Sequence, residues 1–153
     1  MKKISLVALL ALIVCSAVAF GVKAIAVNEV DSILRGSVTR DGKVISLAKN
    51  ISLMPNEIVT WQHVLKNNRN SAIQNINIDE PIIPGVLMDS SAQAGSAAVS
   101  FSLDGQSYSS QPVIFQDGKR VPAPSSQYKF IRFSYPRVEA GQEVVASFQV
   151  VVR

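Results

Sequence analysis

The chain has 153 residues and a formal net charge of +4 at pH 7, which comes largely from its first 24 residues. That segment holds three lysines and no acidic residue, so the rest of the chain carries 12 basic against 11 acidic side chains. This balance excludes the basic surface that nucleic-acid-binding proteins need. The single cysteine, Cys15, also lies in the first segment, so residues 25–153 can form neither a disulfide nor a thiolate metal site.

Residues 1–24, MKKISLVALLALIVCSAVAFGVKA, have the plan of a secretory signal peptide. Lysines precede an unbroken stretch of apolar or small residues from Ile4 to Val22, and small residues stand at its exit. We expect a signal-peptide helix that is cleaved after Ala24, with cleavage after Ala19 as the alternative. The apolar stretch also reaches the lower limit for a spanning helix, so retention as an N-terminal anchor stays open. Cleavage would leave residues 25–153 as one domain with no stable membrane span.

The first hairpin is expected within residues 32–53, where Asp41 and Gly42 separate two extended stretches. An Asp-Gly pair favours a tight turn because both of its positions tolerate positive φ. Residues 57–66 then alternate with the period of a strand. The face that we expect to turn inward in this strand contains Val59, Trp61, His63 and Leu65.

Five further stretches show strand-like alternation, and Asp-Gly pairs at positions 104 and 117 predict two more tight hairpin turns. No sustained helical period occurs after residue 24. Seven or eight short strands predict an all-β fold, an antiparallel immunoglobulin-like β-sandwich. The five stretches are residues 71–79, 97–105, 111–118, 127–135 and 143–152.

Four segments, in the same order, resemble the bacterial and archaeal conserved-repeat domain called domain of unknown function 11. In the first, NEIVTWQHVLKNN, Trp61 stands at the family's aromatic position and Asn67 at its closing Asn, whereas Asn56 replaces the usual Gly and Arg69 the usual small residue. The resemblance implies an exported or cell-envelope protein with an immunoglobulin-like sandwich and no established activity. The other segments are IQNINIDEPIIPGV, with its turn at Asp79, Pro81, Ile83 and Pro84, then AVSFSLDGQSY and YKFIRFSYPRVEAGQEVVASFQVVV.

Few residues are candidates for chemistry. His63 is the only histidine, and its place on the face of Trp61 favours packing over catalysis. Serines are numerous, but no Gly-x-Ser-x-Gly elbow occurs. Asp79 and Glu80 are adjacent in a strand, so they point to opposite faces and cannot form a paired carboxylate. We therefore predict no catalytic, cofactor-binding or metal-binding residue, and no enzyme.

Calcium binding is the alternative that the acidic residues leave open. A calcium site needs several oxygen ligands that converge from loops. No dense Asp-x-Asp-x-Asp loop occurs, but four acidic residues near predicted strand ends could supply some ligands. They are Asp79, Glu80, Asp104 and Asp117.

Two stretches indicate interaction surfaces. In residues 127–135, an outward face of Tyr128, Phe130 and Arg132 is typical of contact surfaces, unless the loop at 119–126 covers it. The strand at 143–152 carries little charge on its outward face. At a sheet edge it could accept a strand from another copy, unless it is paired on both sides.

The sequence thus predicts an exported β-sandwich protein in the periplasm, at the cell surface or outside the cell. We expect a structural or interaction role, with a cell-envelope protein, a polysaccharide or a second copy as partner, and no nucleic acid. The alternative is a small-ligand or calcium-binding module of the periplasm.

Overall fold

The structure is a computed structural model that describes residues 29–47, 51–83, 85–88 and 91–153. The predicted signal peptide lies outside these residues. Among them, no helix is long and apolar enough to cross a membrane. Strands account for nearly all of the regular structure: β1 (Val30–Arg40), β2 (Lys43–Ser46), β3 (Ile58–Asn67), β4 (Ile73–Pro81), β5 (Gly85–Leu87), β6 (Ala98–Ser102), β7 (Val113–Gln116), β8 (Lys119–Pro122), β9 (Phe130–Val138) and β10 (Glu143–Val152), with one 3-10 turn, η1 (Ser125–Gln127).

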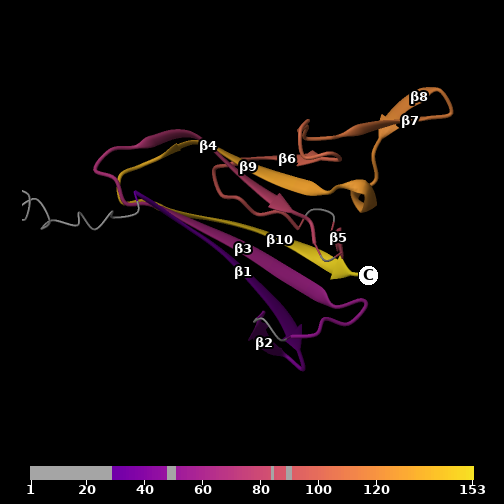
Figure 1. Ribbon diagram of the computed structural model, residues 1–153, viewed down its shortest axis with the longest axis horizontal. Coiled ribbons are helices and arrows are strands. Elements are labelled where there is room, and N and C mark those ends of the chain that lie inside the picture. Colours follow the sequence, from indigo (N-terminus) through magenta and orange to yellow (C-terminus); the bar gives the residue numbers. More distant parts are fainter. Residues whose placement is uncertain (1–28, 48–50, 84, 89–90) are drawn as a thin grey trace, which may run out of the picture.

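Two antiparallel sheets form the layers of the fold (Figure 1). One sheet has five strands in the order β2-β1-β3-β10-β5, and the other has three in the order β4-β9-β6. Among the described strands, β7 and β8 pair only with each other, as a hairpin that projects from the layers (Figure 1). The all-β, antiparallel prediction is confirmed, and the arrangement is consistent with a β-sandwich.

The core lies between the inner faces of the two sheets. In β3 the inward set is the one predicted, because Val59 and Leu65 are buried while the alternate residues are more exposed. From the opposite sheet, Ile131, Phe133 and Tyr135 of β9 are buried against them, as the alternation in residues 127–135 predicts. Side-chain direction was therefore readable from the sequence wherever one face of a strand is apolar.

Two of the three Asp-Gly pairs form the predicted tight turns. Asp41 and Gly42 have φ of 50° and 73°, and Asp117 and Gly118 have φ of 51° and 75°, which is the double positive φ of a type I′ hairpin. The prediction is wrong at Asp104, which lacks positive φ. There the chain makes a wider loop that returns to β6 only as a single bridge between Phe101 and Ser109.

The last strand is not a sheet edge. β10 pairs with β3 over Glu143–Val151 and with β5 at Val150–Val152. Further along the same side, Gln93 bridges to Ser147. The premise that residues 143–152 form an exposed edge is wrong over Ser147–Val152, because β5 and Gln93 occupy that side, as the alternative view held.

Candidate functional site

The β7–β8 hairpin, which we call the arm, carries exposed apolar side chains away from the core. Its register places Phe115 opposite Arg120 and Val113 opposite Pro122 on one face. Phe115 is 76% exposed, the highest value among the large hydrophobic residues described. An isolated two-stranded hairpin is marginally stable in water, so the exposed apolar side chains on this face indicate a surface for a partner.

The base of the arm is tied to the body by the chain itself. The N–H of Ala123 donates to the carbonyl of Pro112 at 2.8 Å, and both residues are buried. The arm thus leaves and re-enters the fold at neighbouring points. Among the described strands, β7 and β8 form no ladder with any strand but each other.

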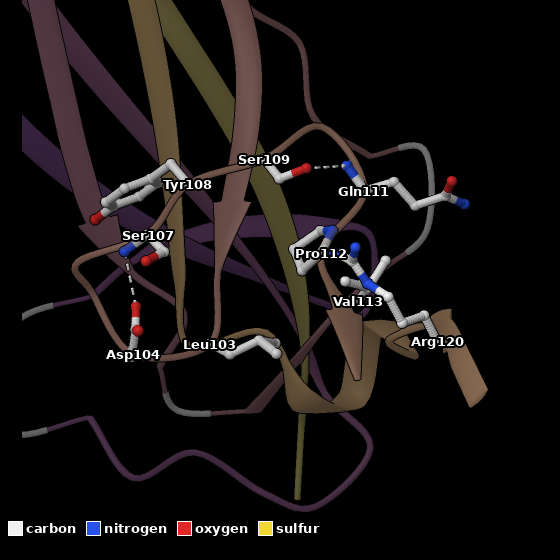
Figure 2. A pocket seen from close by; sticks show the side chains of 9 residues that line it. All are labelled: Leu103, Asp104, Ser107, Tyr108, Ser109, Gln111, Pro112, Val113 and Arg120. Carbon is white, nitrogen blue, oxygen red and sulfur yellow. Dashed lines mark hydrogen bonds between the residues drawn. The ribbon is translucent and has the colours of Figure 1, made fainter. Parts of the chain in front are cut away.

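A cleft of about 370 Å³ lies beside the base of the arm (Figure 2). Leu103, Pro112 and Val113 contribute apolar lining, and Tyr108 and Arg120 add an aromatic ring and a guanidinium. The remaining lining is polar and comes from the loop after β6. A mixed lining of this kind is typical of sites that hold a small polar molecule or a partner side chain.

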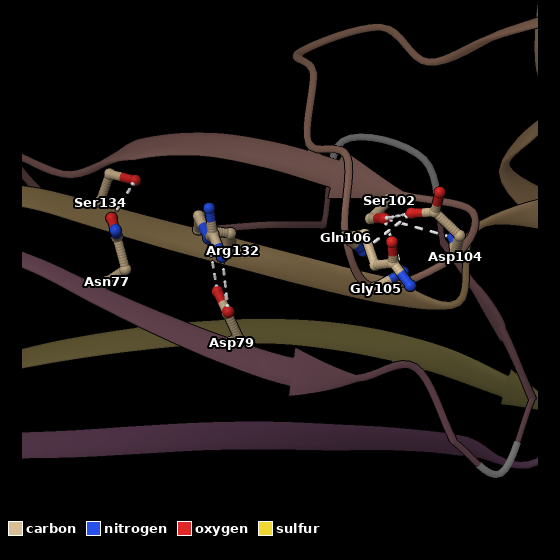
Figure 3. Close-up of polar contacts among 8 residues, drawn as sticks. All are labelled: Asn77, Asp79, Ser102, Asp104, Gly105, Gln106, Arg132 and Ser134. Atoms are coloured by element: carbon tan, nitrogen blue, oxygen red, sulfur yellow. Dashed lines mark hydrogen bonds and ion pairs between the residues drawn. The ribbon is translucent and has the colours of Figure 1, made fainter.

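The outer face of β9 is partly covered at Arg132. Arg132 donates through Nε and Nη2 to the two carboxylate oxygens of Asp79, at 2.5 and 2.7 Å (Figure 3). The ring of Tyr108 lies against the same guanidinium, with its centroid 3.6 Å from Cζ. Burial and the nearby Asp79 carboxylate raise the pKa of Tyr108, and the hydrogen bond to Asp79 raises the pKa of Arg132. The covering segment is the loop after β6, not the predicted residues 119–126.

Tyr128 does not belong to this outer face, contrary to the prediction. It lies before β9 begins, and its ring stacks on Phe101 at a centroid distance of 4.7 Å and an angle of 15°. Phe101 shares the inner face of its sheet with Ile131. Strand alternation misplaces Tyr128 because η1 interrupts the extended backbone just before it.

Asp104 organises the loop after β6. Its Oδ1 accepts hydrogen bonds from the backbone N–H of Gln106 at 2.8 Å and the hydroxyl of Ser102 at 2.9 Å (Figure 3), and from the backbone N–H of Ser107 at 2.9 Å (Figure 2). These bonds, led by that from Ser107, lower the pKa of Asp104. Such side-chain bonds to the following backbone replace a tight hairpin by a wider turn, which explains the incorrect hairpin prediction.

A second cluster, of polar side chains, joins the two sheets. His63 of β3 is 8% exposed and Glu80 of β4 is 7% exposed, and His63 Nδ1 is hydrogen-bonded to Glu80 Oε1. The hydroxyl Oγ of Ser32, on β1, lies 2.7 Å from His63 Nε2. His63 is therefore buried, as the packing interpretation requires, but it is also the centre of a polar chain that the sequence does not predict.

The four acidic candidates for calcium lie in separate places. Asp79 pairs with Arg132 on the outer face, whereas Glu80 points inward to His63, as the opposite facing of neighbours predicts. Asp104 closes its own loop, and Asp117 lies in the turn of the arm. Within the described part of the chain, no three His, Cys, Asp or Glu side chains gather as a metal site.

No protein-family model, curated protein or solved structure significantly matches this chain. The resemblance to domain of unknown function 11 therefore stays a prediction.

Proposed function

We propose that this chain is an exported cell-envelope protein with an immunoglobulin-like sandwich, located in the periplasm, at the surface or outside the cell, and that its arm binds another envelope protein. The export part rests on the composition of residues 1–24. The immunoglobulin-like layout is supported by the two antiparallel sheets that enclose one core. The interaction role rests on one observation, the exposed face of the arm.

A protein partner suits this face better than a polysaccharide. Phe115 and Arg120 lie side by side across the hairpin, next to Val113 and Pro122. Aromatic residues and arginine are enriched in the buried centres of protein interfaces, whereas lysine and acidic residues are depleted there. On this face Arg120 is the only charged residue, so a partner can cover the face without burying several charges.

Site-specific photo-cross-linking in the producing cells tests the proposal. A photoreactive amino acid replaces Phe115, and a matched control replaces Val44, which is 74% exposed on β2. After fractionation, we expect a discrete cross-linked species in the envelope fraction from position 115 and none from position 44. Identical patterns from both positions, or no cross-link from position 115, would contradict the role of the arm.

The cleft beside the arm favours a second candidate, the small-ligand module. Arg120 reaches this cleft as well as the exposed face of the arm. A thermal-shift screen of small anionic and sugar ligands would detect such binding, since a ligand that binds only the folded state raises the melting temperature. A shift that disappears in Arg120→Ala would assign the ligand to the cleft.

A further inference from the structure

We propose that Ser32 is the nucleophile of an acyl-transfer site that hydrolyses small carboxylic esters, with His63 as its general base and Glu80 as the residue that positions the base. This goes beyond the binding role of the arm and departs from the prediction, made from the sequence, that the chain is no enzyme. The inference starts from the hydrogen-bonded chain Ser32–His63–Glu80.

The two contacts of His63 define the roles. A carboxylate only accepts hydrogen bonds, so Glu80 Oε1 fixes the tautomer that carries its proton on Nδ1. Nε2 then carries no proton and accepts a hydrogen bond from the hydroxyl of Ser32, with Oγ and Nε2 2.7 Å apart. A nucleophile hydrogen-bonded to a base that is itself oriented by a third group is the signature of an activated serine.

The three side chains are exposed to the degree that this chemistry needs, with the nucleophile open to solvent and the other two residues buried. His63 and Glu80 are both buried, whereas Ser32 is exposed. The base and the positioning carboxylate come from different sheets, β3 and β4, so the packing of the sandwich holds them in place. Glu80 satisfies only Nδ1 of the buried imidazole, and the group on Nε2 is an exposed hydroxyl that a substrate could reach.

The backbone next to Ser32 lies on the side of β1 that faces away from β3. On that side β2 pairs with β1 over Ser37–Arg40 and the N–H of Leu47 donates to Gly36, and no other described residue forms a ladder with the first half of β1. The N–H of Asn68 donates to the carbonyl of Glu29. In the antiparallel ladder between β1 and β3, hydrogen-bonded pairs therefore recur at every second residue from Glu29, and Ser32 belongs to a pair that is not hydrogen-bonded. The N–H of a residue in such a pair points away from the neighbouring strand, so the N–H of Ser32 points away from β3. It has no hydrogen bond to another described residue.

This N–H is suited to stabilise the oxyanion that forms at an ester carbonyl beside Oγ. A backbone N–H aimed at the developing charge is the usual donor for this purpose. One such donor suits an ester with a good leaving group rather than an amide. Leu34 follows two positions later on the same face and is 43% exposed, which favours a short apolar acyl group.

The reaction balances with water as the only co-reactant. As Ser32 Oγ bonds to the ester carbonyl carbon, its proton passes to His63 Nε2. The bond from that carbon to the alcohol oxygen then breaks, and the leaving alcohol takes the proton from Nε2. Water next attacks the acyl-serine ester by the same route, which releases the carboxylic acid and restores Ser32.

Labelling with a fluorophosphonate probe tests the assignment. Ser32 Oγ would bond to phosphorus as fluoride leaves, and mass spectrometry of the digested full chain would place the adduct on Ser32. We expect Ser32→Ala to abolish the adduct and Ser46→Ala, an exposed serine of β2, to leave it unchanged. No adduct on Ser32, or an equal yield after Ser32→Ala, would overturn the proposal.

Hydrolysis of p-nitrophenyl acetate gives an independent readout. We expect Ser32→Ala to remove the protein-dependent rate and His63→Gln to lower it about 100-fold or more, the low end of what a general base contributes. Because Ser32 is exposed, Ser32→Ala tests the idea even if His63→Gln fails to fold. A rate unchanged by Ser32→Ala would show that the cluster only joins the two sheets.

Discussion

Glu80 of the three-stranded sheet and His63 of the five-stranded sheet form a buried hydrogen bond that joins the two layers. Each would otherwise be a polar group in an apolar core, which is costly without a partner. Their contact therefore stabilises the alignment of the sheets whether or not Ser32 takes part in chemistry.

Removing this carboxylate should destabilise the fold. We expect Glu80→Ala to lower the free energy of unfolding by about 1–3 kcal/mol, because it leaves the imidazole of His63 buried without its Nδ1 partner. Urea denaturation measures the change. Glu143→Ala, at an exposed glutamate that starts β10, is the control and should change the stability by less than about 0.5 kcal/mol. Equal effects of the two substitutions would contradict the coupling.

The Arg40–Glu57 pair should give the fold part of its acid sensitivity. The hydrogen bond from Arg40, reinforced by the Met54 N–H, lowers the pKa of Glu57 from 4.5 to about 2. A carboxyl group whose pKa is lower in the folded state stabilises it above the unfolded pKa. That contribution should be present above pH 4.5 and disappear as the pH falls towards 2.

Urea midpoints between pH 2 and 7 measure this dependence. Glu57→Gln should be less stable than the parent chain at neutral pH and should show a smaller loss below pH 4.5, because it has no carboxylate to protonate. Glu143→Gln serves as the control and should keep the slope of the parent chain. The interpretation is wrong if Glu57→Gln keeps that slope as well.

Trp61 should contribute to stability by packing and by one hydrogen bond. Its ring lies over Gly36, where an added Cβ would come within 2.7 Å of Cζ3, and its Nε1 donates to the carbonyl of Ile83 at 2.8 Å. We expect Trp61→Ala to cost about 3 kcal/mol, the low end for a large aromatic residue, because the side chain is half-buried. Urea denaturation is the measurement, and a change below about 1 kcal/mol would place the ring outside the core.

Deleting the arm should leave the sandwich folded. Pro112 and Ala123 are already joined by a 2.8 Å backbone hydrogen bond, so a two-glycine link can replace residues 113–122. We expect the free energy of unfolding to change by less than about 1 kcal/mol, since a hairpin that packs on little stabilises little. Thermal and urea denaturation measure this, and loss of folding would show that the arm is part of the core.

The sequence by itself determined the features that depend on neighbours along the chain. Alternation in residues 57–66 and 143–152 specified which side chains face inward, because successive side chains of a strand point to opposite faces. The pairs Asp41-Gly42 and Asp117-Gly118 specified tight turns, because only their local φ is involved. At Asp104 the same pair of residues does not form a tight turn, because the Asp104 side chain accepts hydrogen bonds from the backbone that follows it.

Only the tertiary structure decided which distant groups meet. Ser32 and Glu80 are 31 and 17 positions from His63, and no spacing in the sequence relates them. The one available signal was an inward-facing histidine, which needs a buried partner. Whether β10 is an edge also depended on where β5 and Gln93 pair. A strand's own residues set the direction of its side chains, whereas its neighbours follow from how the whole chain closes its sheets.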